Sequence, residues 1–191
     1  LETLFAGSIA DAKEREQNLS ITELEKLVVV SEIDAAKILA PRENIHVIAE
    51  IKRASPSRGK MSDIEHPEEL AAIYANSGAS AISVLTEQRQ FLGHLNDLRA
   101  VRNAVAVPLL RKDFIANEYQ ILEARAAGAN IILLIVAGLD ESTLIRLKAF
   151  AEDLGMAAFI ETHTLDEVKI AIQAGVQLIG VNARDLSTFE T

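Results

Sequence analysis

The chain of 191 residues contains no cysteine and no tryptophan, and aromatic residues make up only 4% of it. Without cysteine there are neither disulfide bridges nor thiolate metal sites, and a reducing compartment is favoured, so we expect a cytoplasmic protein. The longest apolar runs, such as residues 131–137, are far shorter than the roughly 18 residues that a membrane span needs. Because no signal peptide pattern is present either, a membrane partner is not expected.

The formal net charge is −9 at pH 7, and no basic stripe accompanies it. This balance argues against a nucleic-acid partner, which normally requires clustered lysine and arginine. An anionic ligand would have to be attracted by a few local cations. The apolar fraction of 49% with few aromatics predicts an aliphatic, alanine-rich core, and the length suits one domain.

Residues 1–45 predict a helical extension that packs on the main part of the chain, residues 46–191. We expect a polar helix from about Ile9 through the AKEREQ stretch, whose charges form a solvated face. A second helix is expected over residues 22–30, with Ser20 or Thr22 as its cap, and a third from Asp34 to just before Pro41.

A strand and helix unit recurs from residue 46 onward. The strand-like runs are residues 46–51, 80–85, 107–110, 130–136, 157–160 and 177–181. The helical patterns between them are residues 67–76, 94–103, 118–127, 140–154 and 165–174. Four connections from a helix to the next strand have similar sequences: SGAS, AGAN, AGVQ and DLGM. In each, a glycine is expected to end the helix in a left-handed conformation.

Continuous apolar strands separated by helices predict a parallel sheet that helices cover. The glycine-rich motifs GxGxxG and GxxxxGK[ST], which are typical of open nucleotide-binding sheets, are absent. Polar residues follow most of the strands at their carboxyl ends, where a (β/α)₈ barrel holds its active site. The pattern therefore favours a TIM (β/α)₈ barrel with an N-terminal helical extension.

The HVIAEIKRASPSRG stretch, residues 46–59, places two charges at the end of the first strand. Glu50 and Lys52 are two positions apart, so they point to the same face. On this stretch alone, a structural ion pair and a catalytic pair are equally good interpretations. Ser55 and Ser57 form either a plain turn or a loop that binds phosphate through hydroxyl and backbone N–H groups.

Other strand ends supply candidates for acid and base catalysis. Lys112 lies where the buried PLL run ends, and desolvation there would suit it to proton transfer. Glu161 ends an apolar strand and is the best partner carboxylate, with Asn182 as a neutral donor. Arg111 and Asp113 are interpreted as pairing with neighbours. Phe91 and Phe114 belong either to the core or to the wall of an aromatic pocket.

The four histidines show no ligand spacing such as HxxxH, so a metal site is not expected. Together, two lysines and two carboxylates suit acid and base catalysis on a small anionic molecule.

These residues resemble the indole-3-glycerol phosphate synthase family, the (β/α)₈ barrel enzymes of the tryptophan pathway. The matching segments follow one another in order from about residue 46 to the end: AEIKRASPSRG, SVLTE, FLGHLNDL, PLLRKDFI, ILLIV, IETH and IGVNARDLSTF. The resemblance implies a carboxy-lyase that converts 1-(2-carboxyphenylamino)-1-deoxyribulose 5-phosphate to indole-3-glycerol phosphate, without metal or organic cofactor.

The resemblance also implies residue roles. Lys112 corresponds to the general acid, Lys52 to the lysine that contacts the anionic groups, and Glu161 to the carboxylate that handles protons in dehydration. Glu50 would orient Lys52. Asn182 completes the implied catalytic set as a hydrogen-bonding residue near the sugar hydroxyls. The implied substrate-binding residues are Ser55, Ser57, Arg184, Phe91, Phe114, Leu133, Ser83 and Leu186.

The chain departs from the family pattern because it ends at Thr191, after about the sixth strand and helix unit. We therefore expect a barrel truncated there, whose open edges would favour pairing. A monomer is expected for a complete barrel, and an edge-paired dimer is the alternative for this chain. The alternative functions are a non-catalytic barrel fragment and a related phosphate-binding barrel such as phosphoribosylanthranilate isomerase.

Overall fold

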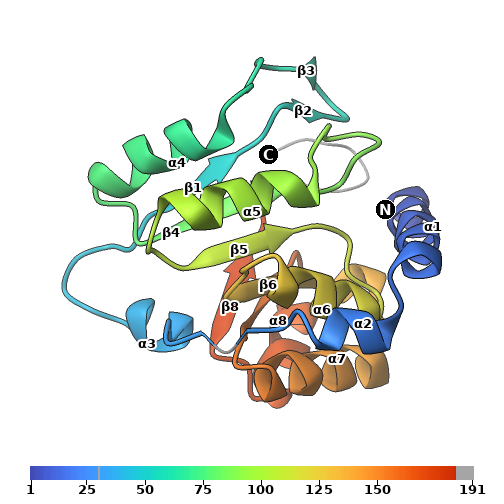
Figure 1. Ribbon diagram of the computed structural model, residues 1–191. Coiled ribbons are helices and arrows are strands. Elements are labelled where there is room, and N and C mark those ends of the chain that lie inside the picture. The colour runs from blue at the N-terminus through green and yellow to red at the C-terminus, as the bar shows by residue number, and fades with distance from the viewer. Residues whose placement is uncertain (30, 184–191) are drawn as a thin grey trace.

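The computed structural model describes residues 1–29 and 31–183, and its centre is one sheet of six parallel strands (Figure 1). The strands are β1 (Ile48–Ile51), β4 (Ala81–Leu85), β5 (Leu109–Lys112), β6 (Ile131–Ile135), β7 (Ala157–Thr162) and β8 (Leu178–Val181). Their order in the sheet is their order in the chain. This is the strand order of a (β/α)₈ barrel, whereas in a doubly wound sheet the order of the strands reverses at one point in the sheet. The predicted fold class is confirmed as six strands of a half-barrel.

Helices connect these strands and cover the outside of the sheet (Figure 1). They are α4 (Pro67–Asn76), α5 (Leu95–Ala104), α6 (Glu118–Ala126), α7 (Glu141–Asp153) and α8 (Leu165–Gln173). The predicted bounds of all these helices and strands are confirmed to within two residues. Gly78 and Gly175 follow two of the helices with φ values of 92° and 66°, the left-handed conformation that the repeated joints predict.

Alternation along the strands separates two apolar layers. Ile82 and Leu134 point outward into a large core with helix residues such as Leu98 and Leu144. Leu110, Leu133 and Ile135 point inward, into a smaller cluster that fills the inside of the half-barrel. Since inward and outward positions differ by one residue, Glu50 and Lys112 lie on the inner face with the second group.

The loop after β1 forms a short antiparallel hairpin, β2 (Ala54–Ser55) paired with β3 (Gly59–Lys60). Gly59 has a φ of 61°, which the tight turn requires. A single 3₁₀ turn, η1 (Val136–Gly138), follows β6.

The N-terminal segment contains three helices, and two of the predicted bounds are wrong. α1 (Glu2–Asn18) begins well before Ile9, because Phe5 packs into the inner cluster and stabilises its first turns. α2 (Ile21–Glu25) has the predicted Ser20 cap but ends before the β-branched run that starts at Val28, which disfavours helix. α3 (Ala35–Ile38) begins after Asp34 as predicted.

Figure 1 places α1 beside the carboxyl ends of the strands and α3 at their opposite end. Within residues 1–29 and 31–183, no helix combines the length and the apolar character that crossing a membrane requires.

Candidate active site

A cavity of about 170 Å³ opens at the carboxyl ends of the strands. It brings together residues that are far apart in the sequence and that the strand-end pattern singles out. The predicted site residues that line it are Lys52, Ser55, Ser57, Phe91, Lys112, Phe114, Leu133, Glu161 and Asn182. In a (β/α)₈ barrel this is the end of the sheet where catalytic residues gather.

Glu50 links the two lysines of the cavity. Its Oε2 atom accepts a hydrogen bond of 2.8 Å from Nζ of Lys112, and its Oε1 atom accepts one of 2.5 Å from Nζ of Lys52. Burial would raise the pKa of the Glu50 carboxyl, but the two ammonium groups outweigh burial and lower the pKa below its usual value. Glu50 therefore stays ionised near neutral pH and holds two cations side by side.

Glu161 lies in β7, toward the carboxyl end of the inner face, and lines the cavity. Its Oε1 atom accepts a hydrogen bond of 3.1 Å from Nδ2 of Asn182, which follows β8. The same oxygen lies 3.5 Å from Nε2 of His163. The side chain of Glu161 is only 13% exposed, so these two contacts largely fix the position of its carboxylate.

The apolar wall of the cavity includes Phe91, Phe114 and Leu133. The rings of Phe91 and Phe114 are 6.1 Å apart between centroids and tilted by 44°, a favourable aromatic geometry. Glu87 fixes the loop that carries Phe91, because its carboxylate accepts hydrogen bonds from the backbone N–H groups of Arg89, Gln90 and Phe91. The wall is thus supported by the end of β4.

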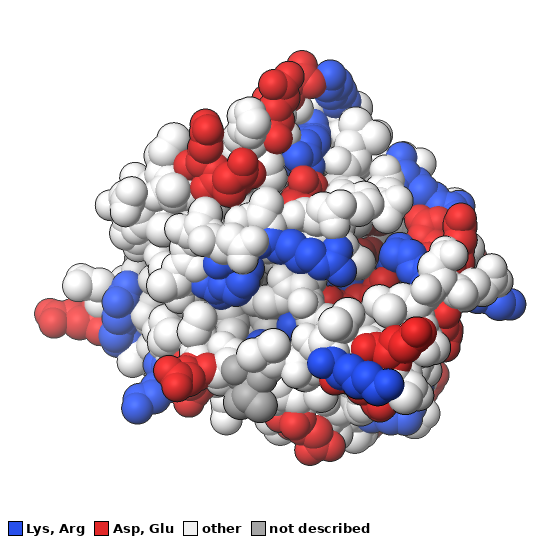
Figure 2. Space-filling view, in the orientation of Figure 1, with Lys and Arg blue, Asp and Glu red and all other residues white. Residues whose placement is uncertain are grey.

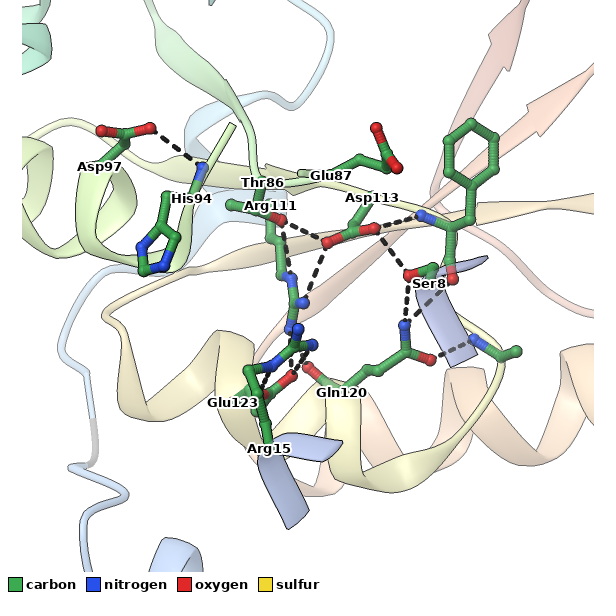
Figure 3. A network of polar contacts seen from close by, with 12 residues as sticks. Ser8, Arg15, Thr86, Glu87, His94, Asp97, Arg111, Asp113, Gln120 and Glu123 are labelled. Carbon is green, nitrogen blue, oxygen red and sulfur yellow. Dashed lines mark hydrogen bonds and ion pairs between the residues drawn. The ribbon is translucent and has the colours of Figure 1, made fainter. Parts of the chain in front are cut away.

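Asp113, between Lys112 and Phe114, is the centre of a buried polar network (Figure 3). Its carboxylate accepts hydrogen bonds from the hydroxyls of Ser8 (2.9 Å) and Thr86 (2.6 Å), from Nη2 of Arg111 (3.0 Å) and from the backbone N–H of Phe114 (2.9 Å). Burial would raise the pKa of Asp113, but the Arg111 guanidinium and these donors lower it. The interpretation that Arg111 and Asp113 pair with neighbours agrees with the structure, in which they pair with one another.

The network extends from β5 to α6 and α1 (Figure 3). Arg111, which is fully buried, also donates to Oε2 of Glu123 at 3.3 Å. Glu123 in turn accepts hydrogen bonds from Nε and Nη2 of Arg15 at 2.5 and 2.8 Å. Each buried charge therefore has an opposite charge beside it, as burial requires.

The network fixes α1 over the mouth of the site, where Leu1 and Leu4 line the cavity. These two leucines were not predicted from the sequence, because nothing near them in the chain indicates contact with distant strand ends. Leu85 and Ile135, which line the cavity too, were also not predicted. Strand alternation would have found them, since each follows an inward residue by two positions.

Among the predicted site residues that the structure describes, Glu50 and Ser83 are not on the cavity wall, although Glu50 bonds both lysines that are. Ser83 is buried deeper, in register with Glu50, and its hydroxyl has no hydrogen-bond partner in the described part of the chain. Leu85, two residues nearer the carboxyl end, takes the place on the wall that the prediction gave to Ser83. Arg184 and Leu186 lie outside the described residues.

The face in Figure 2 carries acidic and basic side chains interspersed over its surface. Although the net charge is −9, Lys52 and Lys112 bring two ammonium groups to the cavity, beside the carboxylates of Glu50 and Glu161. In the described ranges, no group of three or more histidine, cysteine, aspartate or glutamate residues is arranged to hold a metal ion.

A parallel half-barrel with ionisable side chains gathered at its strand ends defines a protein of the (β/α) barrel class. The chain matches the family model described as "Indole-3-glycerol phosphate synthase" over residues 1–191. The chain therefore belongs to the indole-3-glycerol phosphate synthase family, whose members are lyases of tryptophan biosynthesis.

Curated relatives agree with this assignment. The chain is 50% identical over 192 residues to an indole-3-glycerol phosphate synthase of Leifsonia xyli, and the match covers all of this chain and 74% of the relative. It is 51% identical to that of Mycolicibacterium smegmatis, with all of this chain and 70% of the relative covered. These relatives are longer than the stretch that the chain matches.

Among solved structures, the chain is similar to 3-keto-L-gulonate-6-phosphate decarboxylase from Vibrio cholerae. The TM-score is 0.51 at 18% identity, and the match covers 69% of this chain and 59% of that chain. At this identity the likeness shows the fold alone.

Proposed function

We propose that this chain catalyses ring closure, decarboxylation and dehydration of 1-(2-carboxyphenylamino)-1-deoxyribulose 5-phosphate to indole-3-glycerol phosphate. The observation that carries the proposal is the Glu50 carboxylate held between the ammonium groups of Lys52 and Lys112 at the cavity that Glu161 also lines. Membership of the family supports it.

The reaction needs acids and a base at different points. When the aromatic ring attacks the ketone carbon, the ketone oxygen must gain a proton. Loss of CO₂ then restores the aromatic ring, and the new hydroxyl needs a second proton to leave as water. The neighbouring carbon gives up one proton in that last step. A site for this chemistry therefore needs two proton donations and one acceptance.

Lys112 is proposed as the acid that protonates the ketone oxygen. It ends β5 and lines the cavity, and its hydrogen bond to Glu50 keeps its ammonium group in place. Lys52 is proposed to attract the substrate's anionic groups and to assist the later proton donation. Because both lysines share one carboxylate, the pair keeps an excess positive charge for an anionic substrate.

Glu161 is proposed as the base of the dehydration step, with Asn182 holding its carboxylate and donating to the sugar hydroxyls. The surroundings of the two carboxylates support different roles for them. Two lysines balance the charge of Glu50, whereas Glu161 faces the amide of Asn182 and the imidazole of His163.

The remaining residues are proposed to bind the two ends of the substrate. Ser55 and Ser57, in and after the β2 strand, would contact the phosphate. Arg184, which lies outside the described residues, would support the site. Phe91, Phe114 and Leu133 would enclose the anthranilate ring, and Leu186 is a further candidate. The apolar wall and the polar hairpin are both parts of one cavity lining, as a molecule with an aromatic and a phosphate end requires.

The test is turnover of the carboxyphenylamino substrate, followed by indole fluorescence, with the 191-residue chain and with a longer natural form if one exists. We expect the Lys112→Ala variant to lose on the order of a hundredfold or more in rate, because a general acid contributes at least this much. Lys169→Ala is the matched control, since Lys169 is an exposed lysine on α8 that pairs with Asp166 outside the cavity.

A folded protein without turnover would contradict the proposal and favour the non-catalytic alternative. The edge strands β1 and β8 each have one neighbour in the sheet of the described residues, which is the observation that favours this alternative. Turnover of phosphoribosylanthranilate instead would favour the isomerase. A near-native rate in Lys112→Ala would remove that lysine from the acid role.

A further inference from the structure

His163 lies between two carboxylates beside the candidate active site. It follows β7 and precedes Thr164, the cap of α8. Its Nε2 atom is 3.5 Å from Oε1 of Glu161, and its Nδ1 atom is 3.5 Å from Oε2 of Glu167. Both ring nitrogens are buried, and neither has a hydrogen-bond partner within the described part of the chain. Buried polar atoms without partners are rare and indicate strain, an unseen ligand or function.

A neutral imidazole cannot suit this place. It has one N–H donor and one nitrogen lone pair, so one of its nitrogens would direct a lone pair at a carboxylate. A doubly protonated imidazolium presents an N–H to each carboxylate instead. A slight contraction from 3.5 Å would then give two charge-assisted hydrogen bonds. The three side chains together therefore favour holding one extra proton.

Among residues 1–29 and 31–183, the charged groups that face the ring are these two carboxylates. Glu161 faces it from β7 and Glu167 from α8. β8 contributes the uncharged Asn182, which binds Glu161. The 3₁₀ turn η1, which packs against both β7 and α8, carries no ionisable side chain, and neither does the adjacent strand β6.

The start of α8 does not explain the imidazole. Thr164 accepts the backbone N–H of Glu167, and the Glu167 carboxylate accepts the backbone N–H of His163 at 2.7 Å. This arrangement needs the backbone of residue 163 and would form with any side chain there. It does, however, hold the Glu167 carboxylate beside Nδ1.

We propose that His163 is a positioning residue for Glu161, and that Glu161, His163 and Glu167 hold one proton between them on the imidazole ring. This role rests on the proposed role of Glu161 as the base of dehydration. The N–H at Nε2 directs the Glu161 carboxylate, and the N–H at Nδ1 ties the ring to Glu167 on α8. The ring therefore fixes the position of the base and transfers no proton itself.

Nuclear magnetic resonance tests the shared proton without any turnover. Long-range ¹H–¹⁵N spectra distinguish an imidazolium from either neutral tautomer. At pH 7 we expect His163 to be mainly imidazolium in the wild-type chain, and the protonated fraction to fall severalfold in Glu161→Gln and in Glu167→Gln. Glu152→Gln on α7 is the matched control and should leave the spectrum unchanged. A neutral His163 in the wild type, or one unaffected by both substitutions, would overturn the proposal.

Kinetics then separates positioning from folding. His163→Gln, with its fold checked by circular dichroism, should lower kcat about tenfold with little change in KM, and it should alter the pH profile of kcat. An unchanged kcat and pH profile would overturn the positioning role. If the wild-type chain has no turnover, the proposed function fails, whereas the spectra still decide whether the three groups share a proton.

Discussion

The hydroxyl of Ser8 in α1 donates a hydrogen bond of 2.9 Å to Oδ1 of Asp113, although 105 positions separate the two residues. Asp113 directly follows Lys112, and its other oxygen accepts hydrogen bonds from Thr86 and Arg111. A single buried carboxylate therefore joins the N-terminal helix, two strands and the loop of Phe114 beside the proposed acid.

Asp113→Asn tests how much this junction contributes to stability. Asparagine offers one oxygen where Asp113 has two, so its NH₂ group would face either the N–H of Phe114 or the guanidinium of Arg111. Because one partner of a buried ion pair is also lost, we expect the free energy of unfolding in urea to fall by about 3 kcal/mol. Hydrogen exchange should also become faster in α1, since the Ser8 contact weakens.

Asp63→Asn is the control for that substitution. Asp63 pairs with Lys60, but both side chains are mostly exposed, so we expect a change below about 0.5 kcal/mol. Equal effects of the two substitutions would contradict the role of Asp113 as a buried junction.

The sequence predicted the local parts of this arrangement and missed the distant ones. Strand alternation and polar strand ends were sufficient to predict that Glu50, Lys112 and Glu161 lie near one another, because a parallel barrel brings all strand ends together. The local spacing also indicates that Arg111 can pair with Asp113, since they are two positions apart at the end of one strand.

The contact of Ser8 with Asp113 has no such local signal. Neither the polarity nor the spacing of residues in α1 indicates which strand the helix will contact, and its start was placed too late for the same reason. Ser83 was expected in the pocket lining only through the family resemblance, and the structure places it in register with Glu50, deeper than the cavity wall. The depth of a residue along a strand depends on register, which one sequence does not reveal.

Glu50→Gln tests the carboxylate that the two lysines share. A neutral amide cannot balance two ammonium groups, so Lys52 and Lys112 should repel one another and leave their positions. We expect kcat/KM for the carboxyphenylamino substrate to fall about a hundredfold. The matched control is Glu69→Gln, an exposed position in the first turn of α4, for which the rate should stay unchanged. A full rate in Glu50→Gln would show that the lysines do not depend on this carboxylate.

Gly93→Ala tests the close packing of the loop that carries Phe91. A Cβ atom at residue 93 would lie 2.2 Å from the backbone oxygen of Leu85 and 2.9 Å from the backbone nitrogen of Thr86. These atoms belong to the end of β4, where the Thr86 N–H bonds the Lys112 carbonyl, so they cannot move without breaking the sheet. We expect a loss of about 2 to 3 kcal/mol in the free energy of unfolding.

Gly7→Ala in α1 is the comparison for Gly93. The three atoms nearest to its Cβ would all belong to the Arg89 side chain, the first at 3.2 Å, and that exposed side chain can move away. We expect stability equal to or slightly above that of the wild type, because alanine favours helix. A stable Gly93→Ala protein would mean that the loop after β4 has room that the structure does not give it.

Asp140 predicts a specific dependence of stability on acid pH. As the cap of α7, it accepts hydrogen bonds from Ser142 and Thr143, which lower its pKa from 3.8 to about 2. A carboxyl with a lowered pKa in the folded state contributes stability that is complete above its unfolded pKa, near 4, and is lost as the pH falls through about 2. Urea unfolding between pH 5 and pH 2 should therefore show a smaller loss in Asp140→Asn than in the wild type, because asparagine still caps the helix but does not titrate. Asp166→Asn, at an exposed position of α8, is the control and should follow the wild-type curve. If the Asp140→Asn curve also followed the wild-type curve, Asp140 would not be the source of this pH dependence.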